Sequence, residues 1–267
     1  MSEPAATASP LPRPAPPWRH PASKVFVVLP AYDEEENLGS LLERIDQAMY
    51  ESGSDYEVIL VDDGSRDGTV RVAQEYARFM PIRIERHEAN QGLGATIRGG
   101  LKVASAACRD DDVVVAMDAD NTHTPGLIRS MSRLIEEGSD VVIASRYRPG
   151  SYVRGVPLHR RVLSYVASIL FRIVFPIRGV RDYTCGYRAY RGRVLKDAFR
   201  TAGDAFVSQG GFQCMVDILL NLRKMGVIFR ETPLILRYDL KGGASKMKVA
   251  QTIFRTLLLM LRRRVGR

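Results

Sequence analysis

Residues 24–65 read KVFVVLPAYDEEENLGSLLERIDQAMYESGSDYEVILVDDGS, and this stretch decides the fold class. In the run 24–29 every residue after Lys24 is apolar, as is typical of a strand buried on both faces. Apolar residues then recur at helical spacing over 35–50, and 57–61 is a second apolar run. A strand, a helix and a strand in this order predict the first unit of a parallel sheet.

The same alternation continues to about residue 145. Further strands are predicted at 82–86, 113–117 and 140–144, and further helices at 67–79, 92–107 and 125–137. This pattern predicts an α/β fold with a doubly wound, mostly parallel sheet. Beyond residue 145 the pattern loosens, with helices predicted at 209–225 and 247–264 and short strands at 227–231 and 234–238.

The composition indicates one large domain. The chain has 267 residues, 45% of them hydrophobic, which is enough to bury one sizeable core. Residues 1–22 hold half of the fourteen prolines and are predicted to form a disordered tail. The expected organisation is this tail, a single domain over 23–246, and a basic amphipathic helix over 247–267.

Several classes of protein are excluded by what the sequence lacks. The three cysteines are odd in number and far apart, which excludes a disulfide scaffold and a CxxC zinc site. The sequence contains no run of 18 apolar residues that is free of charge, so no transmembrane helix is predicted. No signal peptide is recognised. The P-loop, GxSxG and HExxH motifs are absent. Ile97 stands where the third glycine of GxGxxG would be, which argues against a Rossmann oxidoreductase.

The net charge of +9 is concentrated in one segment. Residues 141–193 contain eleven arginines, no lysine and one acid, Asp182, which gives a net charge of +10. A second basic cluster follows Asp239, after which the chain has no acid. Localised positive charge indicates an anionic partner such as phosphate, nucleic acid or an anionic membrane. A solubilising surface is the alternative, although solvated faces usually mix charges of both signs.

Polar residues stand where the predicted strands end. Asp62 and Asp63 follow one strand, and Asp118 and Asp120 follow another. Because ligands bind at the carboxyl ends of strands in open α/β sheets, these residues are expected at one edge. Clustered like charges repel, and a bound cation would relieve this repulsion. Asp118 and Asp120 are therefore predicted to bind Mg²⁺ or Mn²⁺, and His123 is either a further ligand or a polar loop residue.

The order of motifs LPAYDEEEN (29–37), VDDGSRDGT (61–69), NQGLGATIRGG (90–100), MDADNTHTP (117–125), ASRY (144–147) and GYRAY (186–190) resembles glycosyltransferase family 2. Within that family it is most similar to dolichyl- or polyprenyl-phosphate mannose synthases. The resemblance implies a single-domain GT-A fold, the Rossmann-like fold of nucleotide-diphospho-sugar transferases, followed by the C-terminal amphipathic helix.

The resemblance also implies which residues bind the donor. The matching positions for the nucleotide and its diphosphate are Pro30, Tyr32, Glu34, Val61, Asp63, Asp118, Ala119, Asp120 and Lys246. In this family the DAD element holds Mg²⁺ or Mn²⁺, which stabilises the departing diphosphate. The family has an arginine six residues before the lysine, but this chain has Leu240 there. Arg237 or Lys241 is expected to replace it.

On the acceptor side, the resemblance implies a polyprenyl phosphate. The positions that match its phosphate site are Arg146, Arg160 and Ser164. A lipid monophosphate is already an anion at neutral pH, so the reaction requires no general base. It requires cations, and the forked donors of arginine suit phosphate oxygens. Asp120 and Arg146 are the residues expected to carry the chemistry.

The predicted function is an inverting, metal-dependent transfer of a hexose, mannose from GDP-mannose, onto a polyprenyl phosphate. The first alternative is a family 2 enzyme with a UDP-sugar such as UDP-glucose, or with another lipid or soluble acceptor. A distant alternative is a non-catalytic binder of anionic ligands or nucleic acid, but the acidic sheet edge argues against nucleic acid.

A polyprenyl chain leaves the bilayer only at high cost, so the enzyme is expected at a membrane surface. Residues 162–177 are apolar, with Arg172 and Arg178 spaced to reach lipid head groups, and 248–264 form a basic amphipathic pattern. The expected location is cytoplasmic, peripherally associated with the inner face of a membrane. This arrangement is compatible with a membrane-embedded partner protein.

Overall fold

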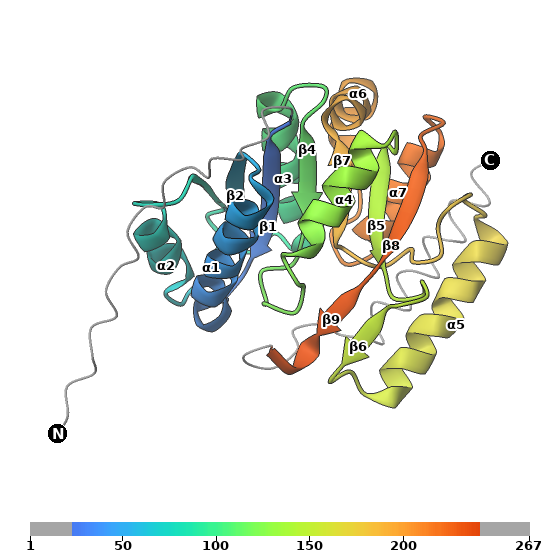
Figure 1. Cartoon of the computed structure of the whole chain (residues 1–267), viewed down its shortest axis with the longest axis horizontal. Helices are drawn as coiled ribbons and strands as arrows, with labels where there is room; N and C mark the ends of the chain where they lie inside the picture. The colour runs from blue at the N-terminus through green and yellow to red at the C-terminus, as the bar shows by residue number, and fades with distance from the viewer. Residues whose placement is uncertain (1–22, 241–267) are drawn as a thin grey trace.

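Residues 23–240 of the protein are described by a computed structural model, apart from the side chains of His159 and Arg160. Seven strands form one sheet in the order β3-β2-β1-β4-β7-β5-β8 (Figure 1). They are β1 Val25–Ala31, β2 Tyr56–Asp62, β3 Ile82–Arg86, β4 Val113–Ala116, β5 Val141–Ser145, β7 Arg188–Arg191 and β8 Phe229–Pro233. All neighbouring pairs are parallel except those that involve β7.

Helices cover both faces of this sheet. The helices are α1 Glu35–Ser52, α2 Thr69–Tyr76, α3 Leu93–Ala107, α4 Leu127–Glu136, α5 Leu158–Val174, α6 Gly192–Ala202 and α7 Cys214–Arg223. Figure 1 shows α1 and α4 in front of the sheet, and α3, α6 and α7 behind it. A separate two-stranded parallel sheet pairs β6, Tyr152–Arg154, with β9, Ile235–Arg237.

The predicted α/β architecture with a mostly parallel sheet is confirmed. The predicted strands and helices up to residue 145 all occur, with ends that differ by up to three residues. The helix predicted at 209–225 is shorter and begins at Cys214. The two strands predicted after it correspond to β8 and β9, whereas β6, α5, β7 and α6 were not predicted.

The antiparallel strand β7 escaped prediction because it is short and contains two arginines. Arg188 is nevertheless fully buried between β4 and β5. Its Nη1 donates to the Met215 carbonyl at 2.7 Å, and its Nη2 donates to the Tyr183 carbonyl at 2.9 Å. These bonds compensate part of the free-energy cost of burying the guanidinium. The local hydrophobic pattern of the sequence does not reveal which residues accept them.

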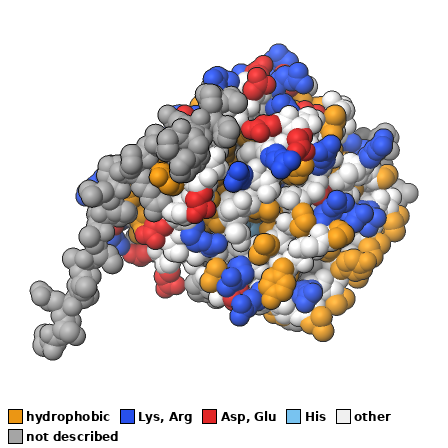
Figure 2. Space-filling model, in the orientation of Figure 1, with side chains coloured by type: hydrophobic (Ala, Val, Ile, Leu, Met, Phe, Trp, Pro, Cys, Tyr) orange, Lys and Arg blue, Asp and Glu red, His pale blue; other side chains and the backbone are white. Residues whose placement is uncertain are grey.

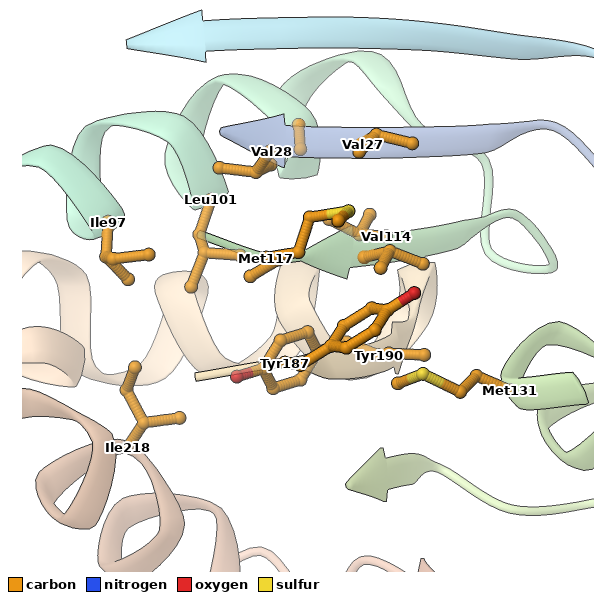
Figure 3. Close-up of a cluster of buried hydrophobic side chains, with 14 of the residues drawn as sticks. Val27, Val28, Ile97, Leu101, Val114, Met117, Met131, Tyr187, Tyr190 and Ile218 are labelled. Atoms are coloured by element: carbon orange, nitrogen blue, oxygen red, sulfur yellow. The ribbon is translucent and has the colours of Figure 1, made fainter. Parts of the chain in front are cut away.

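The core lies between the sheet and the two helix layers. Figure 3 shows side chains from several elements meeting there: Val27, Val28, Ile97, Leu101, Val114, Met117, Met131, Tyr187, Tyr190 and Ile218. β1 and β4 are buried almost throughout because parallel strands covered on both faces need apolar side chains on both sides. Full burial of one such large side chain contributes about 1.5–3 kcal/mol.

The carboxyl ends of the parallel strands share one edge of the sheet, and β9 joins this edge. His123, in the loop after β4, forms an isolated antiparallel bridge with Leu236. The Arg237 N–H donates to the Thr122 carbonyl at 2.9 Å. In Figure 1 the small sheet lies below this edge, beside α5. The loops after β1, β2, β4 and β5 therefore line one shared region.

Parts of the expected organisation lie outside the described residues. These are the tail 1–22, Lys241, Lys246 and the helix over 247–267. Within residues 23–240, none of the helices is both long enough and apolar enough to cross a bilayer.

Candidate active site

Five of the residues predicted to hold the donor lie at or just after the ends of β1 and β2: Pro30, Tyr32, Glu34, Val61 and Asp63. Pro30 pairs in register with Val61, and Ala31 pairs with Asp62. The Asp63 N–H then donates to the Ala31 carbonyl at 2.8 Å. Parallel pairing of two adjacent strands thus places the two motifs side by side, as the sequence predicts.

Asp63 holds the loop that leads to α3. Its Oδ1 lies 2.7 Å from Nδ1 of His87 and accepts from the Gln91 N–H at 2.9 Å. Its Oδ2 accepts from the Gly92 N–H at 2.8 Å. Asp63 is buried. Its carboxylate therefore shapes the loop at 87–92.

Glu34 is also fixed by its neighbours. Its N–H donates to Oγ1 of Thr69 at 2.8 Å, and its Oε2 accepts from Nδ2 of Asn37 at 2.7 Å. Asp33 adopts a positive φ of 50°. The Asp33 N–H donates to Ser65 Oγ at 2.9 Å, which ties the two strand-end loops together. The loop that carries Tyr32 is thus held from both sides.

The DAD element forms the turn after β4. The Asp118 side chain is 37% exposed, whereas Ala119 is buried. Asp120 Oδ1 accepts from the Thr122 hydroxyl at 2.7 Å and from the Thr122 N–H at 3.2 Å. Asn121 has a positive φ of 61°, which asparagine tolerates better than most residues. The turn places both carboxylates at the carboxyl edge of the sheet.

His123 supports this turn from inside. It is buried, and its Nδ1 accepts from the Asp118 N–H at 3.2 Å. Its ring stacks on Tyr187 with centroids 4.8 Å apart. Its Nε2 lies 3.8 Å from Asp118 Oδ2. Of the two interpretations offered by the sequence, this packing favours a loop residue that orients Asp118.

Asp118 and Asp120 fit a hard divalent cation. Within the described part of the chain, no group of three or more His, Cys, Asp and Glu side chains is arranged as a metal site. The protein would therefore contribute two carboxylates, and Mg²⁺ characteristically combines one or two carboxylates with water and substrate phosphate. A Cβ on Gly186 would lie 3.3 Å from Asp118 Oδ1, so this glycine leaves room beside the carboxylate.

Gly92 and Gly94, which match the first two glycines of a dinucleotide-binding motif, lie where two backbone segments approach each other closely. The Gly94 N–H donates to the Gly210 carbonyl at 3.0 Å. A Cβ on Gly94 would lie 1.7 Å from the Gln209 carbonyl oxygen. Gly92 has a positive φ of 88° at the start of α3. The motif therefore packs the loop at 209–211 against the N-terminus of α3.

Arg146, at the end of β5, is held by Asp182. Arg146 Nε donates to Oδ2 of Asp182 at 2.8 Å, and Nη2 donates to Oδ1 at 2.6 Å. Burial disfavours the charged form of Arg146, but the charge of Asp182 and these bonds outweigh it and raise the Arg146 pKa. Burial likewise opposes ionisation of Asp182, but Arg146 outweighs it and lowers the Asp182 pKa. Both groups therefore stay charged.

The other two predicted acceptor residues lie on α5. Ser164 Oγ is 2.9 Å from the Tyr147 hydroxyl, which joins α5 to the segment that carries Arg146. The Arg146 guanidinium carbon lies 5.5 Å from the centre of the Tyr147 ring, within cation–π range. The Arg160 side chain is outside the described part of the structure, although its backbone belongs to the first turns of α5.

Arg237 reaches the same edge from β9. Its N–H binds the loop just after Asp120, and its guanidinium pairs with Asp239, with Nε 2.9 Å from Oδ1. Burial lowers the pKa of Arg44, and the positive charge of Arg237 lowers it further. Of the two expected replacements for the family arginine, Arg237 can thus be placed at the DAD loop.

Sequence reasoning missed the partners of Arg146. Asp182 and Thr184 both accept hydrogen bonds from Arg146 Nη2, at 2.6 Å each. A signal for Asp182 was present, because it is the only acid among the eleven arginines of residues 141–193. An isolated acid in such a segment indicates a specific ion pair, but the sequence does not say with which arginine.

The known proteins to which this chain is similar include glycosyltransferases. A family model described as Glycosyl transferase family 2 matches residues 26–199. A dolichol-phosphate mannosyltransferase of Pyrococcus furiosus is 35% identical over 235 residues, which are 88% of this chain and 62% of the relative. A polyprenol monophosphomannose synthase of Mycolicibacterium smegmatis is 32% identical over 252 residues, 92% of this chain and 91% of the relative. This chain thus spans less than two thirds of the Pyrococcus relative.

Among solved structures, a glucosyl-3-phosphoglycerate synthase from Mycobacterium tuberculosis has a TM-score of 0.63 and 21% identity. The match covers 91% of this chain and 80% of that one, whose structure contains Mn²⁺, uridine diphosphate and glucosyl-3-phosphoglycerate. At this identity the likeness concerns the fold, which is GT-A-like. The family model and the two relatives establish that the chain belongs to glycosyl transferase family 2.

Proposed function

We propose that the protein is a glycosyltransferase that transfers mannose from GDP-mannose to a polyprenyl phosphate at a membrane surface. One observation carries this proposal: the Tyr147–Ser164 contact joins the Arg146 site to α5, a helix that exposes apolar side chains. A phosphate site beside an apolar surface is what a lipid phosphate requires. The names of the relatives, which act on dolichol or polyprenol phosphates, agree with this acceptor.

On the donor side, the strand-end loops of β1 and β2 would bind the nucleotide. Pro30 and Val61, which pair in register there, would lie beside the nucleotide, and Tyr32 would supply a ring for stacking on the base. Asp118 and Asp120 would hold Mg²⁺ or Mn²⁺, which stabilises negative charge on the departing diphosphate. Thr122 holds the Asp120 carboxylate through its hydroxyl, and His123 holds the backbone of Asp118 by accepting from its N–H.

On the acceptor side, Arg146 would bind the phosphate with help from Arg160 and Ser164. The phosphate oxygen attacks the anomeric carbon, and the nucleotide diphosphate leaves on the opposite side, which inverts the configuration. The acceptor oxygen carries negative charge before the reaction, so none of these side chains has to remove a proton. The work of the protein is to orient two anions whose charges repel.

The membrane contact would use α5. Its exposed apolar residues are Leu158, Val162, Leu163, Tyr165, Val166, Ile169, Leu170 and Ile173. Figure 2 shows apolar side chains gathered over this part of the molecule, with basic side chains beside them. This combination suits a helix lying in the interface of an anionic bilayer. It would keep the polyprenyl chain in lipid while the phosphate reaches Arg146.

The first test is thermal stabilisation by GDP and by UDP, each with and without Mn²⁺, because a ligand of the folded state raises its melting temperature. We expect a metal-dependent increase with GDP. An increase with UDP alone would overturn the GDP-mannose donor and favour a UDP-sugar. No increase with either nucleotide would overturn the proposed activity.

The second test is mannose transfer from GDP-mannose to undecaprenyl phosphate in vesicles. Asp120→Ala should abolish both transfer and the metal-dependent part of the stabilisation by GDP. Asp111→Ala is a suitable control, since Asp111 is an exposed carboxylate before β4. Near-normal transfer by Asp120→Ala would contradict the assignment of the metal site.

A further inference from the structure

The fully buried carboxylate of Asp182 clamps one edge of the Arg146 guanidinium. The two side chains form a two-pronged pair through Nε and Nη2, and the Arg146 N–H adds a bond of 3.0 Å to Oδ2. A second Nη2 bond of 2.6 Å goes to the hydroxyl of Thr184. The arginine is therefore fixed through both its backbone and its side chain.

Asp182 is itself anchored to the sheet. Its Oδ1 accepts from the Cys185 N–H at 3.1 Å. The N–H groups of Arg181 and Asp182 donate to Oε1 of Glu231, on β8, at 2.6 and 2.8 Å. The Arg181 carbonyl accepts from Ser168 Oγ on α5 at 2.6 Å. The clamp is thus connected to β8, at one edge of the sheet, and to the proposed membrane helix.

The clamp leaves one nitrogen of the guanidinium for a ligand. Arginine has five N–H donors, one on Nε and two on each Nη. Asp182 and Thr184 take the Nε donor and both Nη2 donors, whereas Nη1 has no hydrogen-bond partner within the part of the chain that the structure describes. The Arg146 side chain is 23% exposed. A bound anion would therefore meet Nη1 rather than the Nε–Nη2 edge that arginine commonly offers.

We propose that Asp182 is a positioning residue that aims Nη1 of Arg146 at the acceptor phosphate. This inference rests on the proposed function, because it takes the acceptor to be a phosphate monoester. The negative charge of Asp182 opposes phosphate binding, so its benefit is geometric: a fixed donor loses little freedom when the ligand arrives. Asp182 is not a general base, since all its carboxylate contacts are with donors that stabilise the ionised form.

The test is a double-mutant cycle on the binding of geranyl phosphate, a short water-soluble isoprenoid phosphate, measured by calorimetry. Asp182→Asn should weaken binding about tenfold in the wild-type background, because an oriented charge-assisted bond is lost. In the Arg146→Met background the same change should have no further effect. Equal weakening in both backgrounds, or none in the wild-type background, would overturn the proposal.

Asp197→Asn is the matched control. Asp197 forms an exposed pair with Arg200 on α6, with a distance of 2.7 Å, so this variant removes an Arg–Asp pair far from the proposed contact. Its affinity for geranyl phosphate should equal that of the wild type. A loss like that of Asp182→Asn would show that removing any such pair weakens binding, which also contradicts the proposal.

Should Asp182→Asn fail to fold, Thr184 gives a milder test, because it is exposed and binds the same Nη2. Thr184→Val should weaken binding of geranyl phosphate, whereas Thr184→Ser should retain it. Unchanged binding by Thr184→Val would overturn the clamp.

The transfer assay separates this proposal from the function on which it rests. In undecaprenyl phosphate vesicles, Asp182→Asn should raise the KM for the acceptor and leave the KM for the donor unchanged. A wild type that binds geranyl phosphate with the expected cycle but transfers no mannose would overturn the proposed activity and leave the role of Asp182 intact. A raised donor KM with an unchanged acceptor KM would overturn the role of Asp182.

Discussion

Single residues at this sheet edge are held by contacts that span the chain. Arg146 and Asp182 are 36 residues apart in sequence yet form a buried pair. Gly94 meets Gln209 through a close approach of backbones. Such contacts make the site sensitive to single substitutions, in ways that depend on what each side chain touches.

Gly94→Ala should destabilise the protein by roughly 1–3 kcal/mol, because a new Cβ would lie 1.7 Å from a backbone oxygen that cannot rotate away. Gly126→Ala is the control, since nothing lies within 4 Å of a Cβ at that position. Urea unfolding of both variants measures the difference. Equal stability of the two variants would show that the loop at 209–211 can move away from α3 at no cost in free energy.

Because of Asp182, the free energy of unfolding should decrease as the pH falls below the ordinary pKa of a carboxyl group. Its folded pKa is lowered from an ordinary value of 3.8, so its stabilising contribution is complete above that value and is lost as pH falls through the lower, folded pKa. Asp182→Asn, which breaks a buried pair, should cost about 3 kcal/mol at neutral pH. The cost should shrink below pH 3.8, as urea unfolding at several pH values can show. A cost independent of pH would contradict this linkage.

At the scale of elements, α5 differs from the other helices. Its inward contacts include Phe171, which is buried and stacks on Tyr183, and Ser168, which binds the Arg181 carbonyl. Much of the remaining apolar surface of the helix is exposed. The helix is thus anchored along one side, and its other side is available to a bilayer in the proposed function.

Ile173→Glu should reduce binding to anionic phospholipid vesicles about tenfold or more, because burying one large aliphatic side chain contributes about 1.5–3 kcal/mol. Ile173 is 73% exposed. Ile228→Glu is the matched control, since Ile228 is 57% exposed but lies directly before β8 rather than on α5. Vesicle co-sedimentation measures both. Equal losses would show that exposed apolar residues in general, and not α5, determine binding.

At the scale of the whole molecule, one continuous core extends across the seven-stranded sheet and includes all three cysteines. Burial raises the pKa of Cys108, and it raises the pKa of Cys185 and of Cys214 to about 12. Thiolate is the reactive form of cysteine, so both access and ionisation are suppressed in the folded protein.

The three thiols should therefore react slowly with a disulfide reagent such as Ellman's reagent under native conditions, and fully in urea. The absorbance of the released thiolate gives the count directly. One thiol that reacts quickly in the folded protein would contradict this packing at its position. Labelling during urea unfolding would also report whether the core opens in a single cooperative step.

The sequence by itself determined the β-α-β alternation, because hydrophobic periods are local and show directly which segments become strands or helices. It also placed Asp118, Asp120 and Arg146 at one edge, since parallel strands end on the same side. The tertiary structure alone decided that β7 enters between β4 and β5 in the antiparallel sense. It also decided that Asp182 clamps Arg146 and that α5 keeps an apolar side exposed. These features depend on pairings between segments distant in the chain, which no local period records.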